Sequence, residues 1–144
     1  MIGEVRGAEA LDMLQAMNTG HDGSLSTGHG NSPIDMIRRI ETMVLMGMSM
    51  NLEAVRGQIA GGLDILIHLG RLRDGSRKVL EITEVVGMRG QEIVLNPLYQ
   101  FQEDEIREDN VKEKIKGSLQ STGNKLQHTE KLLAAGFSKY EAEG

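Results

Sequence analysis

The sequence predicts an α/β domain with a mixed sheet, on the strength of two periodicities. Between residues 8 and 63, apolar side chains recur at spacings of three and four, which is typical of amphipathic helices. From residue 64 onward, short apolar runs alternate with turn signals, which is typical of strands. A length of 144 residues fits one domain, or one small domain with an appendage.

The composition restricts the classes of function. Cysteine is absent, which rules out a disulfide framework and thiolate chemistry. The net charge is −5 and no basic stripe is present, which argues against a nucleic-acid partner. No apolar run has membrane-spanning length and no signal peptide is visible, so we expect a soluble cytosolic protein.

The first element is the end of a buried strand, Met1-Ile2, which runs into the polar cluster Gly3 to Gly7. A helix is predicted over 8–18, and Gly20 is placed to stop it. A second polar cluster, Thr19 to His29, is rich in glycine, hydroxyl and imidazole groups. Within it, residues 23–27 predict a short strand that ends in the turn 28–30.

Two further helices follow with clear start signals. Ser32 is the expected N-cap of the first, with Pro33 at the first helical position and Asp35 in the first turn. The second opens at Asn51 and should break at Gly61-Gly62. Their apolar faces predict a compact pair that acts as scaffold, formed by Ile34, Ile37, Ile40, Val44 and Met48 on the first and Leu52, Val55, Ile59 and Leu63 on the second.

An antiparallel meander is predicted next. Residues 65–69 are nearly all apolar, which is typical of a strand covered on both faces. Asp74-Gly75 predicts a hairpin turn into a return strand over 79–86. A second turn at 88–90 leads to a strand over 92–95, and Pro97 is expected to close the sheet region.

The last third divides into a linker and a tail. Five acids between Glu103 and Asp109 indicate a solvated linker or loop. A short strand over 116–120 and a helix from Asn124 to Ala135 are expected to form the tail. The predicted boundaries are therefore 1–102 for the main part, 103–115 for the acidic linker and 116–144 for the strand-helix tail.

Glu4 is the best single candidate for chemistry. A carboxylate at the end of a buried strand lies at the edge where open α/β sheets bind ligands, and it could orient an attacking water or hold a metal-bound water. The alternative is an ordinary strand-end glutamate that is solvated or paired with Arg6. Arg6 carries a planar cation that matches phosphate.

The histidines have weaker signals. His21 and His29 are eight residues apart, which is not a zinc spacing, so phosphate sensing in the hydroxyl-rich cluster is favoured over metal binding. A structural role in a polar loop is the alternative. A triad using Ser24 or Ser26 has no nucleophile elbow to support it. The Walker A pattern Gly-x-x-x-x-Gly-Lys-Ser/Thr is absent.

The two polar clusters resemble a known family. The run from Ile2 to Pro33 is similar to the Walker B segment and histidine box of the type II/type IV secretion ATPases, and most similar to the Flp (Tad) pilus assembly ATPase called CpaF. The similarity continues through residues 41–47, 71–77 and 81–88, and the tail from Gly123 to Gly136 resembles the C-terminus of some members. It therefore covers nearly the whole chain.

The resemblance implies the C-terminal portion of a RecA-like P-loop ATPase domain that works as a hexamer on Mg-ATP. Such a motor sits at the cytoplasmic face of the cell membrane, against inner-membrane platform proteins, and powers pilin or protein export. Glu4 matches the Walker B catalytic glutamate and Arg6 the arginine beside it. The histidine box, which senses the γ-phosphate, is matched by Thr19, Gly20, His21, Ser26, Thr27 and His29.

The family's N-terminal domain, Walker A loop and acidic box have no counterpart in these residues. We therefore expect the chain alone to be inactive, to bind no nucleotide by itself, and to be a truncated gene, a split product or a fragment. An incomplete sheet also predicts self-association or partial disorder. Two other readings are a non-catalytic docking module that joins a secretion platform through its helix pair and tail, and a small metal-dependent hydrolase using Glu4, His21 and His29.

Overall fold

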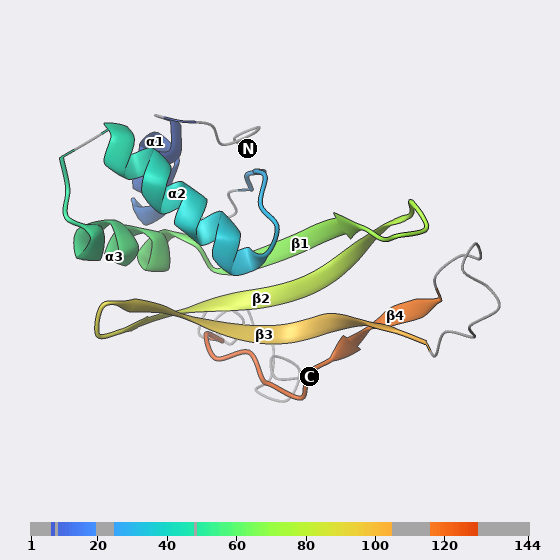
Figure 1. Ribbon diagram of the computed structural model, residues 1–144. Helices are drawn as coiled ribbons and strands as arrows, with labels where there is room; N and C mark the ends of the chain where they lie inside the picture. Colours follow the sequence, from blue (N-terminus) through green and yellow to red (C-terminus); the bar gives the residue numbers. More distant parts are fainter. Residues whose placement is uncertain (1–6, 8, 20–24, 48, 105–115, 130–144) are drawn as a thin grey trace. The chain divides into compact units, whose positions relative to one another are not determined.

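A computed structural model describes residues 7, 9–19, 25–47, 49–104 and 116–129 (Figure 1). Their contacts divide the chain into two compact units: Met1–Asp64 with Val85–Leu95, and Ile65–Glu84 with Asn96–Gly144. The secondary-structure elements follow one another as α1 (Glu9–Asn18), α2 (Pro33–Gly47), α3 (Leu52–Gly62), β1 (Ile65–Arg71), β2 (Arg77–Arg89), β3 (Glu92–Glu103) and β4 (Gly117–Ser121).

The first unit has a helical core in which α1, α2 and α3 all pack against one another. This confirms the predicted helices and their pairing. Apolar side chains at the predicted spacings form the core, together with one residue of β2: Ala10, Met13, Leu14, Ile37, Ile40, Val44, Val55, Ile59 and Val85. Ile34 and Leu52, predicted for the apolar faces, are 40% and 39% exposed, because each lies in the first turn of its helix.

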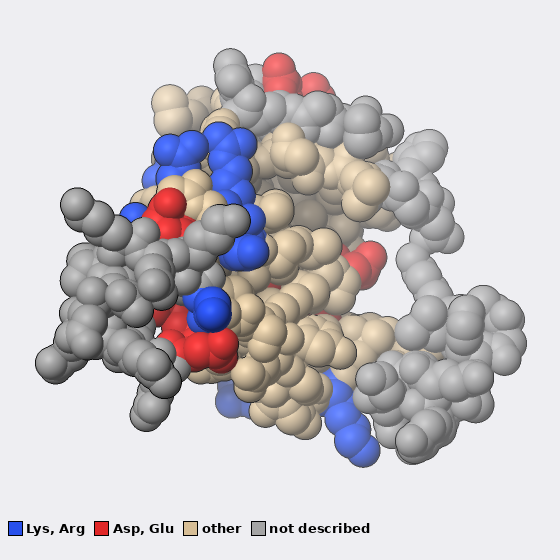
Figure 2. All heavy atoms as spheres, turned by 90° about the vertical axis from the view of Figure 1, so that its right-hand side faces the viewer, with Lys and Arg blue, Asp and Glu red and all other residues tan. Residues whose placement is uncertain are grey.

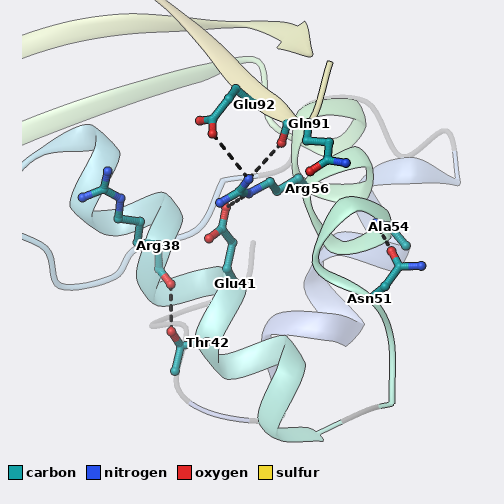
Figure 3. Close-up of polar contacts among 8 residues, drawn as sticks. All are labelled: Arg38, Glu41, Thr42, Asn51, Ala54, Arg56, Gln91 and Glu92. Carbon is teal, nitrogen blue, oxygen red and sulfur yellow. Dashed lines mark hydrogen bonds and ion pairs between the residues drawn. The ribbon is translucent and has the colours of Figure 1, made fainter. Parts of the chain in front are cut away.

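The helix starts use side-chain caps. The Ser32 hydroxyl accepts from the backbone N–H of Asp35 at 3.1 Å, as an N-cap does. The Asn51 side chain likewise accepts from the N–H of Ala54 at 2.7 Å (Figure 3). Both predicted caps are confirmed, so these two helices begin where local sequence places them.

The end of α1 is held by α3. The Asn18 amide donates to Leu14 O in its own helix at 2.8 Å and to Gln58 O of α3 at 3.0 Å. A Cβ at Gly61 would lie 2.6 Å from the Asn18 side-chain oxygen. The glycine pair 61–62 therefore does more than end α3, because it leaves room for Asn18 to approach.

An arginine joins three parts of the first unit (Figure 3). Arg56 on α3 bonds the Glu41 carboxylate of α2 through Nε at 2.9 Å, and Nη1 donates to Gln91 O in the turn after β2 at 2.9 Å. Nη1 also lies 3.8 Å from Glu92 Oε1. Glu41 is buried at 8% exposure, so its charge depends on this guanidinium for compensation.

The strands form one sheet in the order β1-β2-β3-β4. The β1–β2 and β3–β4 pairs are antiparallel, and β2 and β3 are joined by a short turn around Gly90. The predicted mixed sheet is thus not found among the described strands. A parallel pair needs a long crossover connection, and the helices α2 and α3 both precede β1.

The first hairpin turn is confirmed. Gly75 has φ +87° and donates to Leu72 O at 2.9 Å, a conformation in which glycine has no steric penalty. Asp74 Oδ1 accepts from the backbone N–H and the hydroxyl of Ser76 at 2.9 and 2.6 Å. The Asp-Gly pair therefore fixes where β1 reverses into β2.

The prediction that the first strand is covered on both faces is wrong. Burial alternates along β1, with Ile65, Ile67 and Leu69 exposed at 40%, 58% and 65%. β1 lies at the edge of the four-stranded order. A continuous apolar run cannot distinguish a doubly covered strand from an edge strand with one apolar exposed face.

The prediction that Pro97 closes the sheet region is also wrong, because β3 continues through it to Glu103. β4 pairs with residues 99–103, which confirms the predicted strand near 116–120.

The helix predicted from Asn124 to Ala135 is not found at residues 124–129, and its other positions lie outside the described residues. The Asn124 amide instead donates to Pro97 O at 2.8 Å.

Replacing Arg56 by alanine is expected to lower the free energy of unfolding by about 2–3 kcal/mol, because the buried Glu41 carboxylate would lose its only described guanidinium partner. Chemical denaturation followed by far-ultraviolet circular dichroism measures the change. Arg39→Ala is the matched control, since Arg39 pairs with Asp35 at 2.9 Å at the surface and its loss should destabilise the chain much less. Equal costs would contradict the role of Arg56.

Candidate functional site

The predicted histidine box is described in part: Thr19 directly follows α1, and Ser26, Thr27 and His29 lie in the segment Leu25–Asn31, which leads directly into α2. Thr27 forms an isolated β-bridge, so the strand predicted over 23–27 is reduced to one bridged residue among its described positions. The segment then turns through Gly28, His29 and Gly30 to the N-terminus of α2. The site is therefore positioned by the first turn of a helix whose core is well buried.

Met36 on α2 fixes the path of the glycine turn. A Cβ at Gly30 would meet the backbone N and Cα of Met36 at 3.1 and 3.2 Å. A Cβ at Gly28 would instead meet the flexible end of the Met36 side chain. The residues around His29 thus lie close against the backbone of α2. Of the two glycines, Gly30 is the one that faces backbone atoms, which cannot move aside as the end of a side chain can.

Asp35 closes the same turn from the helix side. Its Oδ2 accepts from the N–H of Asn31 at 2.8 Å and from Arg39 Nε at 2.9 Å. The backbone hydrogen bond from Asn31, and then the bond from Arg39, hold the pKa of Asp35 below its ordinary value of 3.8. The carboxylate stays ionised at neutral pH and keeps the loop attached to the helix start.

Ser26 is the unusual member of the segment. Its hydroxyl oxygen is buried, and among the residues that the structure describes it has no hydrogen-bond partner. A buried hydroxyl without a partner is costly, and such groups often mark a place where an unplaced ligand or water bonds. The donor on Ser26 is chemically suited to an oxygen acceptor such as phosphate.

Thr19 lies at the end of α1, and its predicted role in the histidine box stays a prediction. Its hydroxyl donates to Ala16 O at 3.0 Å, so it satisfies a carbonyl at the end of α1. In the described residues, the side chains of Thr19 and Ser26 do not bond each other. Glu4, Arg6, Gly20 and His21 lie outside the described residues, as does Ser24, and their predicted roles stay predictions.

The segment carries side chains that suit phosphate oxygens. Ser26 and His29 carry groups able to donate to phosphate oxygens, and Thr27 adds a hydroxyl. No group of three or more histidine, aspartate or glutamate side chains is arranged to hold a metal ion within the described ranges. The proposed ligands of the metal-dependent alternative include Glu4 and His21, which are not among those residues.

Charge on the described surface is mixed. On the face that Figure 2 shows, lysine and arginine side chains lie beside aspartate and glutamate side chains. In the second unit, for example, Arg73 Nη1 bonds Glu103 Oε2 at 3.0 Å. The predicted absence of a nucleic-acid partner has no direct test here and stays a prediction.

A buried carboxylate was missed by the reasoning from sequence. Glu84 on β2 is 1% exposed and accepts hydrogen bonds from Asn96 and from the backbone of residues 127 and 128. Its position in a run of strand residues gave no signal, because all of its partners are distant in sequence. It belongs to the second unit, whereas the segment 25–31 belongs to the first.

Comparison with known families agrees with the resemblance at the level of the family. The family model described as type II/IV secretion system protein matches residues 1–129. The chain therefore belongs to the type II/IV secretion system protein family. Within the described residues, no helix is both long enough and apolar enough to cross a membrane.

Curated relatives point in the same direction. A putative conjugal transfer protein of Mycobacterium tuberculosis is 40% identical over 82 residues, which cover 57% of this chain and 23% of the relative. The conjugal transfer protein TrbB of Rhizobium radiobacter is 31% identical over 104 residues, which cover 72% of this chain and 31% of TrbB. The chain thus spans less than a third of the length of these relatives.

Replacing Ser26 by alanine is expected to raise the free energy of unfolding by about 1 kcal/mol, because it removes a buried hydroxyl that has no partner among the described residues. Thermal and chemical denaturation measure the effect. Ser32→Ala is the matched control from the same segment: its hydroxyl caps α2, so its loss should cost about 1 kcal/mol. A destabilisation by Ser26→Ala as large as that of Ser32→Ala would show that Ser26 has a structural partner.

Proposed function

We propose that this chain is the C-terminal part of a motor ATPase that powers pilin or protein export, of the Flp (Tad) pilus assembly type. The family match over residues 1–129 supports the general class. The observation that carries the assignment to a nucleotide site is the segment 25–31, in which a buried hydroxyl without a described partner lies next to a glycine turn held against α2. The finer assignment rests on the resemblance of residues 2–33.

The residues of the chain take distinct parts in this proposal. Glu4 orients the attacking water, and Arg6 lies beside it as a cation for phosphate. Ser26, Thr27 and His29 contact the terminal phosphate of the nucleotide. Because residues 28–30 are attached to α2, binding or loss of that phosphate shifts the helix pair α2 and α3. Mg-ATP supplies the phosphoryl group and the charge that these residues recognise.

Thr19, Gly20 and His21 complete the histidine box in the proposal. The Thr19 hydroxyl already bonds the end of α1, so its part is to fix the start of the loop that carries His21. Asn18 anchors the same point on α3. Movement of α3 relative to α2 would therefore alter both ends of the box at once.

The isolated chain is proposed to be inactive. Its 144 residues contain no Walker A loop, and so they lack the lysine of that loop, which binds the β- and γ-phosphates. Activity would require those groups from another part of the same or a neighbouring polypeptide. The assembled motor is proposed to be a hexamer on the cytoplasmic side of the inner membrane, bound to platform proteins there.

A docking module without catalysis is the second candidate. It is favoured by exposed apolar residues at the end of α2, where Leu45 is 39% and Met46 84% exposed. On that reading, the helix pair binds a secretion platform and Glu4 has no chemical role. The two candidates differ in the effect of Glu4 on ATP hydrolysis.

A chimera tests the proposed function. A family member that hydrolyses ATP would have its last part, from the Walker B segment onward, replaced by this chain. We expect phosphate release above background, and a loss of roughly 100-fold or more when Glu4 is changed to glutamine, because water would no longer be activated.

Glu9→Gln is the matched control, since Glu9 is an exposed acid five residues further on at the start of α1. It should leave phosphate release unchanged. A chimera that assembles and supports export equally well with and without the Glu4→Gln substitution would contradict the ATPase proposal and favour the docking module.

A further inference from the structure

The segment Thr122–His128, which we call the strap, runs back along the second unit after β4. Its first end is fixed on β3: the Thr122 hydroxyl and the Asn124 amide donate to Pro97 O at 2.7 and 2.8 Å. The backbone N–H of Thr122 donates to Leu98 O at 2.9 Å. The strap is thus attached by polar contacts at its start.

Its second end is fixed on one carboxylate. Glu84 Oε1 accepts from the N–H of Gln127 at 2.9 Å, and Oε2 accepts from the N–H of His128 at 2.8 Å. The Gln127 N–H also lies 3.2 Å from Oε2. Asn96 completes the set, because its amide donates to Glu84 Oε1 at 3.0 Å and to Lys125 O of the strap at 2.9 Å.

Because Glu84 is buried, its hydrogen bonds contribute more to stability than hydrogen bonds at the surface do. The residue is 1% exposed, and two of its three donor residues, Gln127 and His128, belong to the strap. If the second end of the strap left, the carboxylate would lose two of its three donor residues and would have to bond water in their place. The ionised carboxylate therefore holds the strap in place.

Apolar packing contributes little to holding the strap on the sheet. Leu126 is the one apolar residue among the seven of the strap, and it is half-buried, while most of the others are exposed. Segments with few buried apolar contacts open at low free energy. The attachment of the second end of the strap therefore depends strongly on the Glu84 carboxylate.

We propose that Glu84 is the latch of a releasable strap: residues 125–128 close on the sheet while the Glu84 carboxylate accepts the backbone N–H groups of Gln127 and His128, and open when that carboxylate is lost. Opening frees residues 125–128, while Thr122 and Asn124 stay bonded to β3 and the strands β1 to β3 stay paired.

The charge state of Glu84 agrees with this geometry. Burial alone would raise the pKa of Glu84, but the hydrogen bonds from Gln127, Asn96 and His128, with the nearby His128 side chain, lower it below the ordinary 4.5. The charged or titratable groups on the strap are Lys125 and His128. Across the sheet, Ile65 of β1 pairs with Glu84 and Asn96 lies on β3, and neither titrates.

The direction of the pH dependence follows. A carboxyl whose pKa is lowered in the folded state contributes stability above its ordinary pKa, and this is lost as the pH falls through the lowered value. A positive charge on the His128 side chain attracts the carboxylate and so does not release the strap. Release by acid therefore requires protonation of Glu84 itself, below pH 4.5.

Hydrogen exchange of the full chain at neutral pH, measured by mass spectrometry, tests the latch. In Glu84→Gln, one carboxylate oxygen becomes an amide donor that faces a strap N–H. We expect the amides of residues 125–128 to exchange roughly tenfold faster or more, with the amide of Thr122 and the β1 amides unchanged. Glu81→Gln is the matched control on the same strand, because Glu81 bonds Thr83 and Gln100 and no strap residue; it should leave strap exchange unchanged.

Two results of this experiment would overturn the proposal. One is unchanged strap exchange in Glu84→Gln, and the other is an equal rise in the strap and β1, which would make Glu84 a general core residue. If circular dichroism shows that Glu84→Gln does not fold, the unaltered chain is followed from neutral pH downward, with intrinsic exchange rates corrected. Loss of strap protection at a higher pH than β1 supports the latch, and simultaneous loss overturns it.

Discussion

The guanidinium of Arg56 is the contact on which the first unit depends. It connects the buried Glu41 of α2, its own helix α3 and the backbone at Gln91. α2 carries the glycine turn and Ser26 at its N-terminus, and α3 receives Asn18, which fixes the end of α1. The residues on both described sides of the predicted histidine box thus adjoin helices that one arginine joins.

Local sequence signals predicted the helix caps and the hairpin turn correctly, but not which strands lie side by side or which strand faces are exposed. The N-caps Ser32 and Asn51 and the turn at Asp74-Gly75 act through neighbours within four residues, and all were predicted correctly. The exposed face of β1 and the passage of β3 through Pro97 depend on which strands lie alongside, which periodicity does not contain. The helix expected from Asn124 is not found at residues 124–129, where the Asn124 side chain bonds a distant carbonyl.

The candidate site shows the same division. The composition of residues 19–30 marked the polar segment, and the structure adds the close approach of Met36 and the buried Ser26 hydroxyl, which has no partner among the described residues. That Thr19 bonds its own helix could not be read from the sequence, since threonine suits both roles. Glu84 was missed because its donors lie 12 to 44 residues away along the chain.

We propose that these 144 residues hold only part of a nucleotide site. Calorimetric titration of the purified chain with Mg-ATP, with Glu4→Gln beside it, tests this most directly. We expect no detectable heat of binding for either protein, because the phosphate-binding loop is not among these residues. Micromolar binding that weakens when Glu4 is replaced would instead show that the chain holds a complete site, and would contradict the proposal.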